Sequence, residues 1–254
     1  MSSAQTVYPF GLPAAPGRKR RIAVIAGDGI GPEVVAQALR AVEPLGIPLE
    51  IVHFPWSADH YLKTKETLPS GALADLRDNF DAIFFGALGD PRVPDGVVAR
   101  DVLLGLRFGL DLYINLRPVQ LLSEKLCPIK GKTRRDVNFW VLRENTEGPY
   151  VQMGGSFKRD TPDEVAISED LNTRKGVERI IRAAFEFAKK TGRKKVAMSD
   201  KSNAMKYAHE MWGRTFEEVG REYPEIERRH VYVDALCLYM LQDPSQFEVI
   251  VTNN

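Results

Sequence analysis

The sequence has few cysteines and no long apolar run, and each absence excludes a class of protein. Cys127 and Cys237 are the two cysteines, and no CxxC motif is present. This argues against a disulfide framework or a structural zinc site and predicts a reducing, cytoplasmic location. No apolar run approaches the roughly 18 residues that a membrane span requires. The first residues lack the apolar stretch of a secretory signal, and their Pro, Gly and Ser content predicts a flexible tail over residues 1–19.

The chain also lacks an excess of either charge. Its 35 Lys and Arg nearly balance 34 Asp and Glu, for a net charge of +1. A nucleic-acid surface usually carries clustered excess Lys and Arg, so no nucleic-acid partner is expected. The one basic run, residues 18–21, is more typical of the flank of a first strand. With 254 residues, the chain is long enough for one large domain or two modest ones.

Strand-like and helix-like segments alternate along the chain, which predicts an α/β fold. Apolar runs predict strands at 21–26, 49–54, 82–85, 112–119, 137–142, 195–198, 230–233 and 248–251. Pro32 is typical of a first helical turn and predicts a helix to about residue 42. A second helix is expected over residues 97–106. Thr173 is a candidate cap for a helix to about residue 190, and Asp234 for another.

Three arginines, one tyrosine and one lysine suggest a site for a small polycarboxylate. Arg107, Arg117 and Arg143 each offer a planar fork that binds a carboxylate through two parallel hydrogen bonds. Tyr150 and Lys201 are side-chain types that exchange protons with an alcohol or an enol when their pKa values are lowered. The sequence therefore predicts an acid–base site for a carboxylate substrate.

Four motifs carry a family resemblance. GDGIGPEV (27–34), LRFGLDLYINLRP (106–118), RENTEGPY (143–150) and KSN (201–203) occur in this order. Together they resemble the β-decarboxylating dehydrogenases, which include the 3-isopropylmalate, isocitrate, homoisocitrate and tartrate/malate enzymes. The resemblance spans roughly residues 20–254. GDGIGPEV is not the GxGxxG fingerprint, so contact with a cofactor and a simple tight turn both stay open for it.

The resemblance implies a two-lobed fold of the isopropylmalate-dehydrogenase kind. Residues 20–112 would form the N-terminal half of a cofactor-side domain, and 113–254 a substrate-side and dimerisation domain. The family's further metal aspartates and its nucleotide-binding loop have no counterpart in these residues. We therefore expect an incomplete first lobe with exposed apolar surface, and no activity from the 254-residue chain alone.

The resemblance also assigns roles. Tyr150 and Lys201 match the catalytic pair, Asn203 would orient substrate or cofactor, and Asp234 would bind Mg²⁺ or Mn²⁺. The implied reaction is NAD-dependent oxidative decarboxylation of a 2-hydroxy dicarboxylate. The cofactor-binding residues stay unknown, as does the choice between NAD and NADP.

Leu103 and Leu104, which precede Arg107, favour 3-isopropylmalate and hence leucine biosynthesis. RENTEG departs from the RELTGG usual in isopropylmalate enzymes, so tartrate or D-malate is the alternative substrate. An inactive fragment or subunit is a third possibility.

Residues 154–168 are polar with a short apolar end. A surface loop is one interpretation, and the resemblance implies an arm that pairs with the same arm of a second subunit. We expect a homodimer that uses this arm and one helix face, formed by Val177, Ile181, Phe185 and Ala188. In such a dimer, Lys201 and Asp234 of one chain would complete the site of the other.

Overall fold

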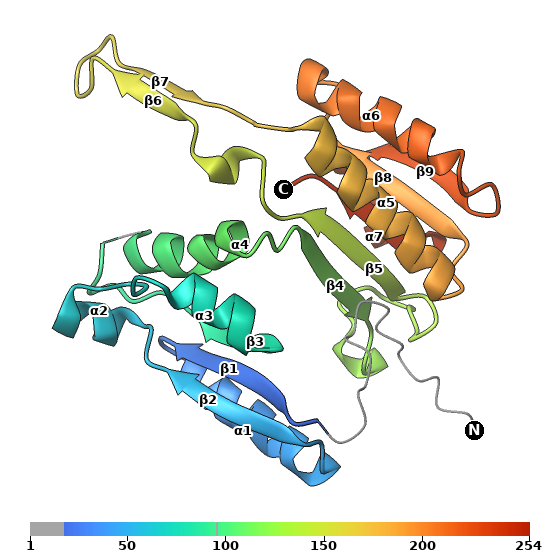
Figure 1. The fold of residues 1–254 in the computed structure, drawn as a ribbon. Coiled ribbons are helices and arrows are strands. Elements are labelled where there is room, and N and C mark those ends of the chain that lie inside the picture. Colours follow the sequence, from blue (N-terminus) through green and yellow to red (C-terminus); the bar gives the residue numbers. More distant parts are fainter. Residues whose placement is uncertain (1–17, 95) are drawn as a thin grey trace. The chain divides into compact units, whose positions relative to one another are not determined.

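The computed structural model describes residues 18–94 and 96–254, and most of the predicted tail lies outside them. The chain divides into two compact units, of which the first ends at Leu112 and the second is Tyr113–Asn254. Both are mixed α/β, as predicted (Figure 1). No helix among the described residues is long and apolar enough to cross a membrane.

The first unit is built on a three-stranded parallel sheet in the order β2-β1-β3. The strands are β1 (Arg20–Gly27), β2 (Leu49–Phe54) and β3 (Ala82–Ala87), and the helices are α1 (Gly31–Val42), α2 (Ala58–Thr64), α3 (Ala72–Asn79), the π-helix η2 (Ala99–Leu104), α4 (Gly105–Gly109) and the short η1 (Glu43–Leu45). Ala23 and Ile25 of β1 share a core with residues of α2, α3, η2 and α4. Helix α1 covers the other face, against β1 and β3.

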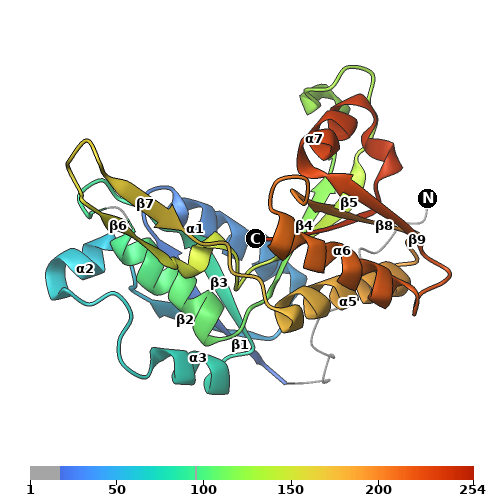
Figure 2. The same cartoon turned by 90° about the horizontal axis from the view of Figure 1, so that it is seen from above.

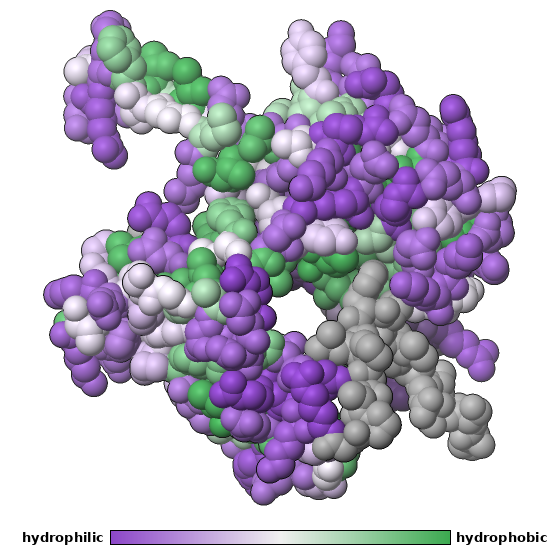
Figure 3. Space-filling view, viewed as in Figure 1, coloured by the Kyte–Doolittle hydropathy of each residue, from purple (hydrophilic) through white to green (hydrophobic). Residues whose placement is uncertain are grey.

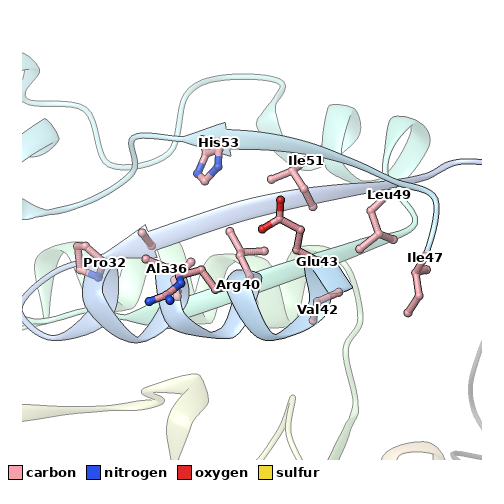
Figure 4. A pocket seen from close by; sticks show the side chains of 12 residues that line it. Pro32, Ala36, Arg40, Val42, Glu43, Ile47, Leu49, Ile51 and His53 are labelled. Atoms are coloured by element: carbon pink, nitrogen blue, oxygen red, sulfur yellow. The ribbon is translucent and has the colours of Figure 1, made fainter. Parts of the chain in front are cut away.

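Helix α1 leaves part of that second face open beside β2. A hollow of about 640 Å³ lies there, between the helix and the strand (Figure 4). Its lining is largely apolar and includes Val35 and Leu39 from α1 and Leu49 and Ile51 from β2. The first unit thus has an open, largely apolar recess on this face of its sheet.

The second unit contains a five-stranded sheet in the order β4-β5-β10-β8-β9. Its strands are β4 (Ile114–Gln120), β5 (Asn138–Glu144), β8 (Lys195–Asp200), β9 (Glu227–Tyr232) and β10 (Val249–Thr252), and its helices are α5 (Arg174–Lys190), α6 (Lys206–Gly220), α7 (Val233–Gln242) and the short η3 (Glu124–Leu126), η4 (Pro149–Val151) and η5 (Pro244–Gln246). Only β4 runs antiparallel in this sheet. Helices α5 and α6 pack on one face and α7 on the other (Figure 2).

Helix α5 begins as predicted, because the Thr173 side chain accepts a hydrogen bond from the Gly176 amide. The prediction for its apolar face was wrong. Val177, Ile181, Phe185 and Ala188 are fully buried inside the unit, in the core shared with α6 and the sheet. A strongly amphipathic helix needs a covering surface, and here α6 and the strands of the same chain supply it. These residues cannot form a dimer interface.

The predicted arm is an antiparallel two-stranded ribbon of β6 (Gly154–Phe157) and β7 (Val165–Ser168). All eight strand residues are exposed. Figure 3 shows an apolar patch on this ribbon, to which Phe157, Val165 and Ile167 belong. An isolated two-stranded ribbon has marginal stability in water. Because the strand residues of this ribbon are all exposed, packing within its own unit does not stabilise it.

Candidate functional site

Arg117 and Arg143 lie on neighbouring strands and point to one face of the second unit's sheet. Strand β4 pairs with β5 so that Asn115 stands opposite Arg143. Trp140 and Leu142 of β5 pack under α5, and side chains alternate between faces with a period of two. Arg143 therefore points to the opposite face. Arg117 does the same, because Leu116 beside it packs against the α5 side.

Two asparagines connect these arginines to Tyr150. Arg117 Nε donates to Asn115 Oδ1 at 2.8 Å, and Asn115 Nδ2 donates to Asn145 Oδ1 at 3.1 Å. Arg143 Nη2 reaches the same Asn145 oxygen at 3.4 Å, and its guanidinium lies 5.8 Å from the centre of the Tyr150 ring. The structure thus brings Arg117, Arg143 and Tyr150 into one chain of contacts.

Among the described residues, no carboxylate neutralises the positive charge of these arginines. Within residues 18–94 and 96–254, neither Arg117 nor Arg143 forms an ion pair, and amide oxygens are their hydrogen-bond acceptors. Arg143 Nε is buried and lacks a hydrogen-bond partner. A buried donor without a partner is costly, and a carboxylate is the natural acceptor for a guanidinium fork. The arrangement suits a carboxylate ligand.

The turn that carries Tyr150 is held by two glutamates of the RENTEGPY motif. The buried Glu144 carboxylate accepts hydrogen bonds from the backbone amides of Thr146 and Glu147 at 2.8–2.9 Å. Glu147 in turn accepts from the Thr173 amide and hydroxyl at the start of α5. Sequence reasoning did not assign a role to either glutamate. For Glu144, the available signal was its position two and three residues before its backbone donors, Thr146 and Glu147. Glu147 accepts from Thr173, which is far along the chain, so no local pattern indicated its role.

Lys201 and Asp234 form a second group. Lys201 Nζ lies 3.1 Å from Asp234 Oδ2, and the two side chains are 39% and 62% exposed. The hydrogen bond from Lys201 lowers the pKa of the Asp234 carboxyl. The prediction that Asp234 caps its helix was wrong, because Tyr232 occupies the cap and Asp234 lies in the first turn of α7. There a carboxylate is stabilised by the positive end of the helix dipole.

The two groups are separated in the sheet. Strand β10 lies between β5, which carries Arg143, and β8, which precedes Lys201. Two strand spacings amount to about 10 Å. Among the described residues, no hydrogen bond or ion pair joins the Arg143 group to Lys201 or Asp234. Asn203 is exposed in the turn after Lys201, and its predicted role stays a prediction.

Leu103, Leu104 and Arg107 belong to the first unit. The two leucines end the π-helix η2, and Arg107 follows in α4. All three side chains are partly buried. π-Helical turns are rare and often mark functional sites, which fits a binding role for this segment.

The GDGIGPEV motif serves packing in this structure. The Asp28 carboxylate accepts hydrogen bonds from the backbone amides of Ala58 at 2.7 Å and Gly89 at 3.1 Å. Gly27 has a φ of +75°, and a Cβ there would stand 1.9 Å from the Ala87 oxygen. A Cβ on Gly31 would meet the Ala26 oxygen at 2.1 Å. Gly27 and Gly31 are therefore explained by the close approach of β1, α1 and β3.

A metal or cofactor finds no complete site in the described residues. They contain no group of three or more His, Cys, Asp and Glu side chains suited to a metal ion. Asp234 offers one carboxylate and is already paired with Lys201, whereas Mg²⁺ requires near-octahedral oxygen ligation. The large hollow of Figure 4 contains none of the candidate catalytic or carboxylate-binding residues. The residues described here therefore do not by themselves fit the metal.

Comparison with known proteins shows the family and the fold of this chain. The family described as isocitrate/isopropylmalate dehydrogenase matches residues 21–254. The 3-isopropylmalate dehydrogenases of Streptomyces griseus and Thermobifida fusca are 46% and 44% identical over 92% and 93% of this chain, which covers 67% and 68% of theirs. The crystal structure of isocitrate dehydrogenase from Methylococcus capsulatus matches with a TM-score of 0.81 at 36% identity, covering 92% of this chain and 67% of that one. The chain belongs to the isocitrate/isopropylmalate dehydrogenase family.

Proposed function

We propose that this protein catalyses the NAD-dependent oxidative decarboxylation of 3-isopropylmalate, as a step of leucine biosynthesis. The observation that carries the proposal is the pair of unneutralised arginines, Arg117 and Arg143, held beside Tyr150 by two asparagines. Such a pair suits a substrate with two carboxylates, and Tyr150 stands next to it as a proton donor.

Each residue has a distinct task in this proposal. Arg117 and Arg143 bind substrate carboxylates through charge-assisted hydrogen bonds. The family resemblance implies the same task for Arg107. Lys201 removes the proton of the substrate hydroxyl. Tyr150 returns a proton to the enol that remains after carbon dioxide leaves. The nicotinamide cofactor, when bound, accepts the hydride from the alcohol carbon.

We also propose that the protein uses a divalent metal, as its family resemblance implies. Asp234 would contribute one oxygen ligand, and the remaining ligands would come from residues outside the described set or from a second subunit. The exposed Asp234 carboxylate, with its lowered pKa, is in its charged form for this purpose. The two free cysteines support a reducing, cytoplasmic setting.

The choice of substrate rests on two observations. Leu103 and Leu104 are half-buried in a π-helical turn before Arg107 and would contact the branched alkyl group. The similar curated proteins cited above are named 3-isopropylmalate dehydrogenases. The RENTEG motif, which favours tartrate or D-malate, stands against these two observations and does not outweigh them.

We propose a homodimer formed through the β6–β7 ribbon. Its strands carry exposed apolar side chains on an element with free edges, and such ribbons gain stability by pairing with another chain. The separation of Lys201 from Arg143 across β10 supports a shared site, in which the lysine of one subunit serves the arginines of its partner.

The ribbon proposal is tested by light scattering at micromolar concentration. Phe157→Ser should shift the protein toward monomer, because Phe157 is 67% exposed on the ribbon. Leu122→Ser, at a side chain 78% exposed elsewhere in the unit, is the matched control and should stay dimeric. A wild-type protein that is strictly monomeric would overturn the proposal.

Because no activity is expected from the 254 residues alone, the function is tested on this chain extended to the length of the similar 3-isopropylmalate dehydrogenases. The panel contains 3-isopropylmalate, tartrate, malate and isocitrate, each with NAD or NADP and magnesium. We expect turnover of 3-isopropylmalate with release of carbon dioxide. Leu103→Ser should lower kcat/KM for 3-isopropylmalate more than for malate, which lacks the branched group. Absence of turnover with all four acids would refute the proposed reaction.

A further inference from the structure

His209 is buried at the start of α6 and contacts the backbone of Lys201. The residue is 3% exposed, and its Nδ1 accepts a hydrogen bond from the Lys201 backbone amide at 2.8 Å. Its Nε2 lies 3.2 Å from Asp170 Oδ2 and 3.0 Å from the side-chain amide of Asn253. The imidazole therefore joins three segments: the turn after β8, the linker before α5 and the turn after β10.

These contacts determine the tautomer of the ring. A backbone amide can only donate, so Nδ1 of His209 must be unprotonated. The proton of the neutral ring is then on Nε2, where the Asp170 carboxylate accepts it. The Asn253 side chain can turn its oxygen toward the same nitrogen, because the two ends of an amide are interchangeable in such a site. Asp170 thus selects the tautomer that leaves Nδ1 free for Lys201.

The backbone of Lys201 depends on this contact. Its carbonyl accepts hydrogen bonds from the amides of Ala204 and Met205, and its amide is satisfied by His209. Within the described part of the chain, the Lys201 side chain contacts Asp234 through an ion pair, and both partners are substantially exposed. Exposed ion pairs hold a side chain weakly. The buried hydrogen bond to His209 is therefore the contact best placed to fix the direction of the lysine.

We propose that His209 is a positioning residue for Lys201. Its neutral imidazole, oriented by Asp170, holds the Lys201 backbone so that the side-chain nitrogen points to the position it needs. The kinetic part of this inference rests on the proposed function, in which Lys201 handles the substrate proton. The structural part, the tautomer and the hydrogen bond, does not.

Three substitutions test the contacts of the two ring nitrogens of His209 separately. In His209→Asn, the amide oxygen takes the place of Nδ1 and keeps an acceptor for the Lys201 amide. In His209→Gln, the longer amide reaches the place of Nε2 and keeps the contact with Asp170, but the acceptor is lost. His209→Ala loses both. A residue with a merely structural role would tolerate Asn and Gln to a similar degree.

The experiment combines kinetics with spectroscopy on the whole protein. We expect His209→Asn to keep kcat within a few-fold of wild type, and His209→Gln and His209→Ala to lower kcat roughly 10²-fold with little change in KM. Hydrogen exchange of the Lys201 amide should stay slow in His209→Asn and become fast in His209→Gln. Equal kcat and equal exchange in the Asn and Gln variants would overturn the proposal.

One measurement does not depend on any variant folding. The ¹⁵N spectrum of the wild-type His209 ring should show the Nε2–H tautomer, and a protonated Nδ1 would overturn the proposal. Lys201→Met serves as the functional reference. If that variant keeps full activity, the proposed role of Lys201 is wrong. If Lys201→Met loses activity but His209→Asn and His209→Gln have equal kcat and equal exchange, the positioning role of His209 alone is rejected.

Discussion

Replacing Arg143 with lysine tests whether the unneutralised guanidinium binds substrate. The substitution keeps the positive charge and removes the planar fork. In the structure, the fork has one weak contact, from Nη2 to Asn145 at 3.4 Å, and a buried Nε without a partner. The variant therefore loses few contacts within the protein. Its main effect should be weaker binding of the ligand that accepts hydrogen bonds from the guanidinium fork.

The expected cost follows from the bond that lysine cannot make. A hydrogen bond to a charged group contributes about 1.5–3 kcal/mol. Each 1.36 kcal/mol corresponds to a tenfold change in rate, so the loss of one such bond lowers kcat/KM roughly 10- to 150-fold. Because the remaining ammonium still attracts the carboxylate, the effect should be smaller than for Arg143→Met, which removes the charge as well.

The assay is the initial rate of cofactor reduction with 3-isopropylmalate, together with thermal unfolding of each variant. Arg214→Lys is the matched control, because Arg214 is 63% exposed and stands 3.9 Å from Glu210 on α6. We expect the control to stay within twofold of wild type and both proteins to unfold at similar temperatures. An Arg143→Lys variant as active as the control would refute the assignment of Arg143 to substrate binding.

Three further predictions address the chemistry, the charge balance and the core. Lys201→Met should block alcohol oxidation, whereas Tyr150→Phe should slow enol protonation roughly 10²–10⁴-fold. Assays of the overall reaction and of an added β-keto acid intermediate separate the two steps. If both variants behave like wild type in both assays, the proposed roles are wrong. Hydrogen bonds from Arg92 hold the pKa of Asp90 at about 2, against an ordinary 3.8. The stability that this low pKa contributes is fully present at pH values above 3.8 and is lost as the pH falls toward 2. Arg92→Gln should therefore raise the pKa of Asp90 toward 3.8, as measured by NMR titration. An unchanged pKa of Asp90 would count against its pairing with Arg92. Phe185→Ala should lower the free energy of unfolding by about 3–5 kcal/mol in denaturant, because the Phe185 side chain is fully buried within one unit. A loss of dimer without a loss of stability would contradict the burial of Phe185 inside the unit.

Much of this protein could be predicted from local sequence because local patterns carry their own physical causes. A run of apolar residues bounded by turn residues predicted β1, and a threonine before an amphipathic stretch predicted the start of α5. The family resemblance, rather than composition, implied an arm at residues 154–168, and the structure has a two-stranded ribbon there. Its pairing with a second subunit stays a prediction. The candidate Arg117, Arg143 and Tyr150 came from residue type and family-like motifs, and the structure brings these three together.

Other features were decided only when distant segments met. Asn115 joins the arginines because β4 pairs with β5 in one register, and a shift by one residue would turn its side chain to the other face. His209 reaches Lys201 because α6 folds back over the end of β8, which no local pattern encodes. The apolar face of α5 shows the limit most clearly. Periodicity revealed that the face must be covered, but α6 and the sheet cover it rather than a second subunit, because burial depends on which surface is nearest in three dimensions.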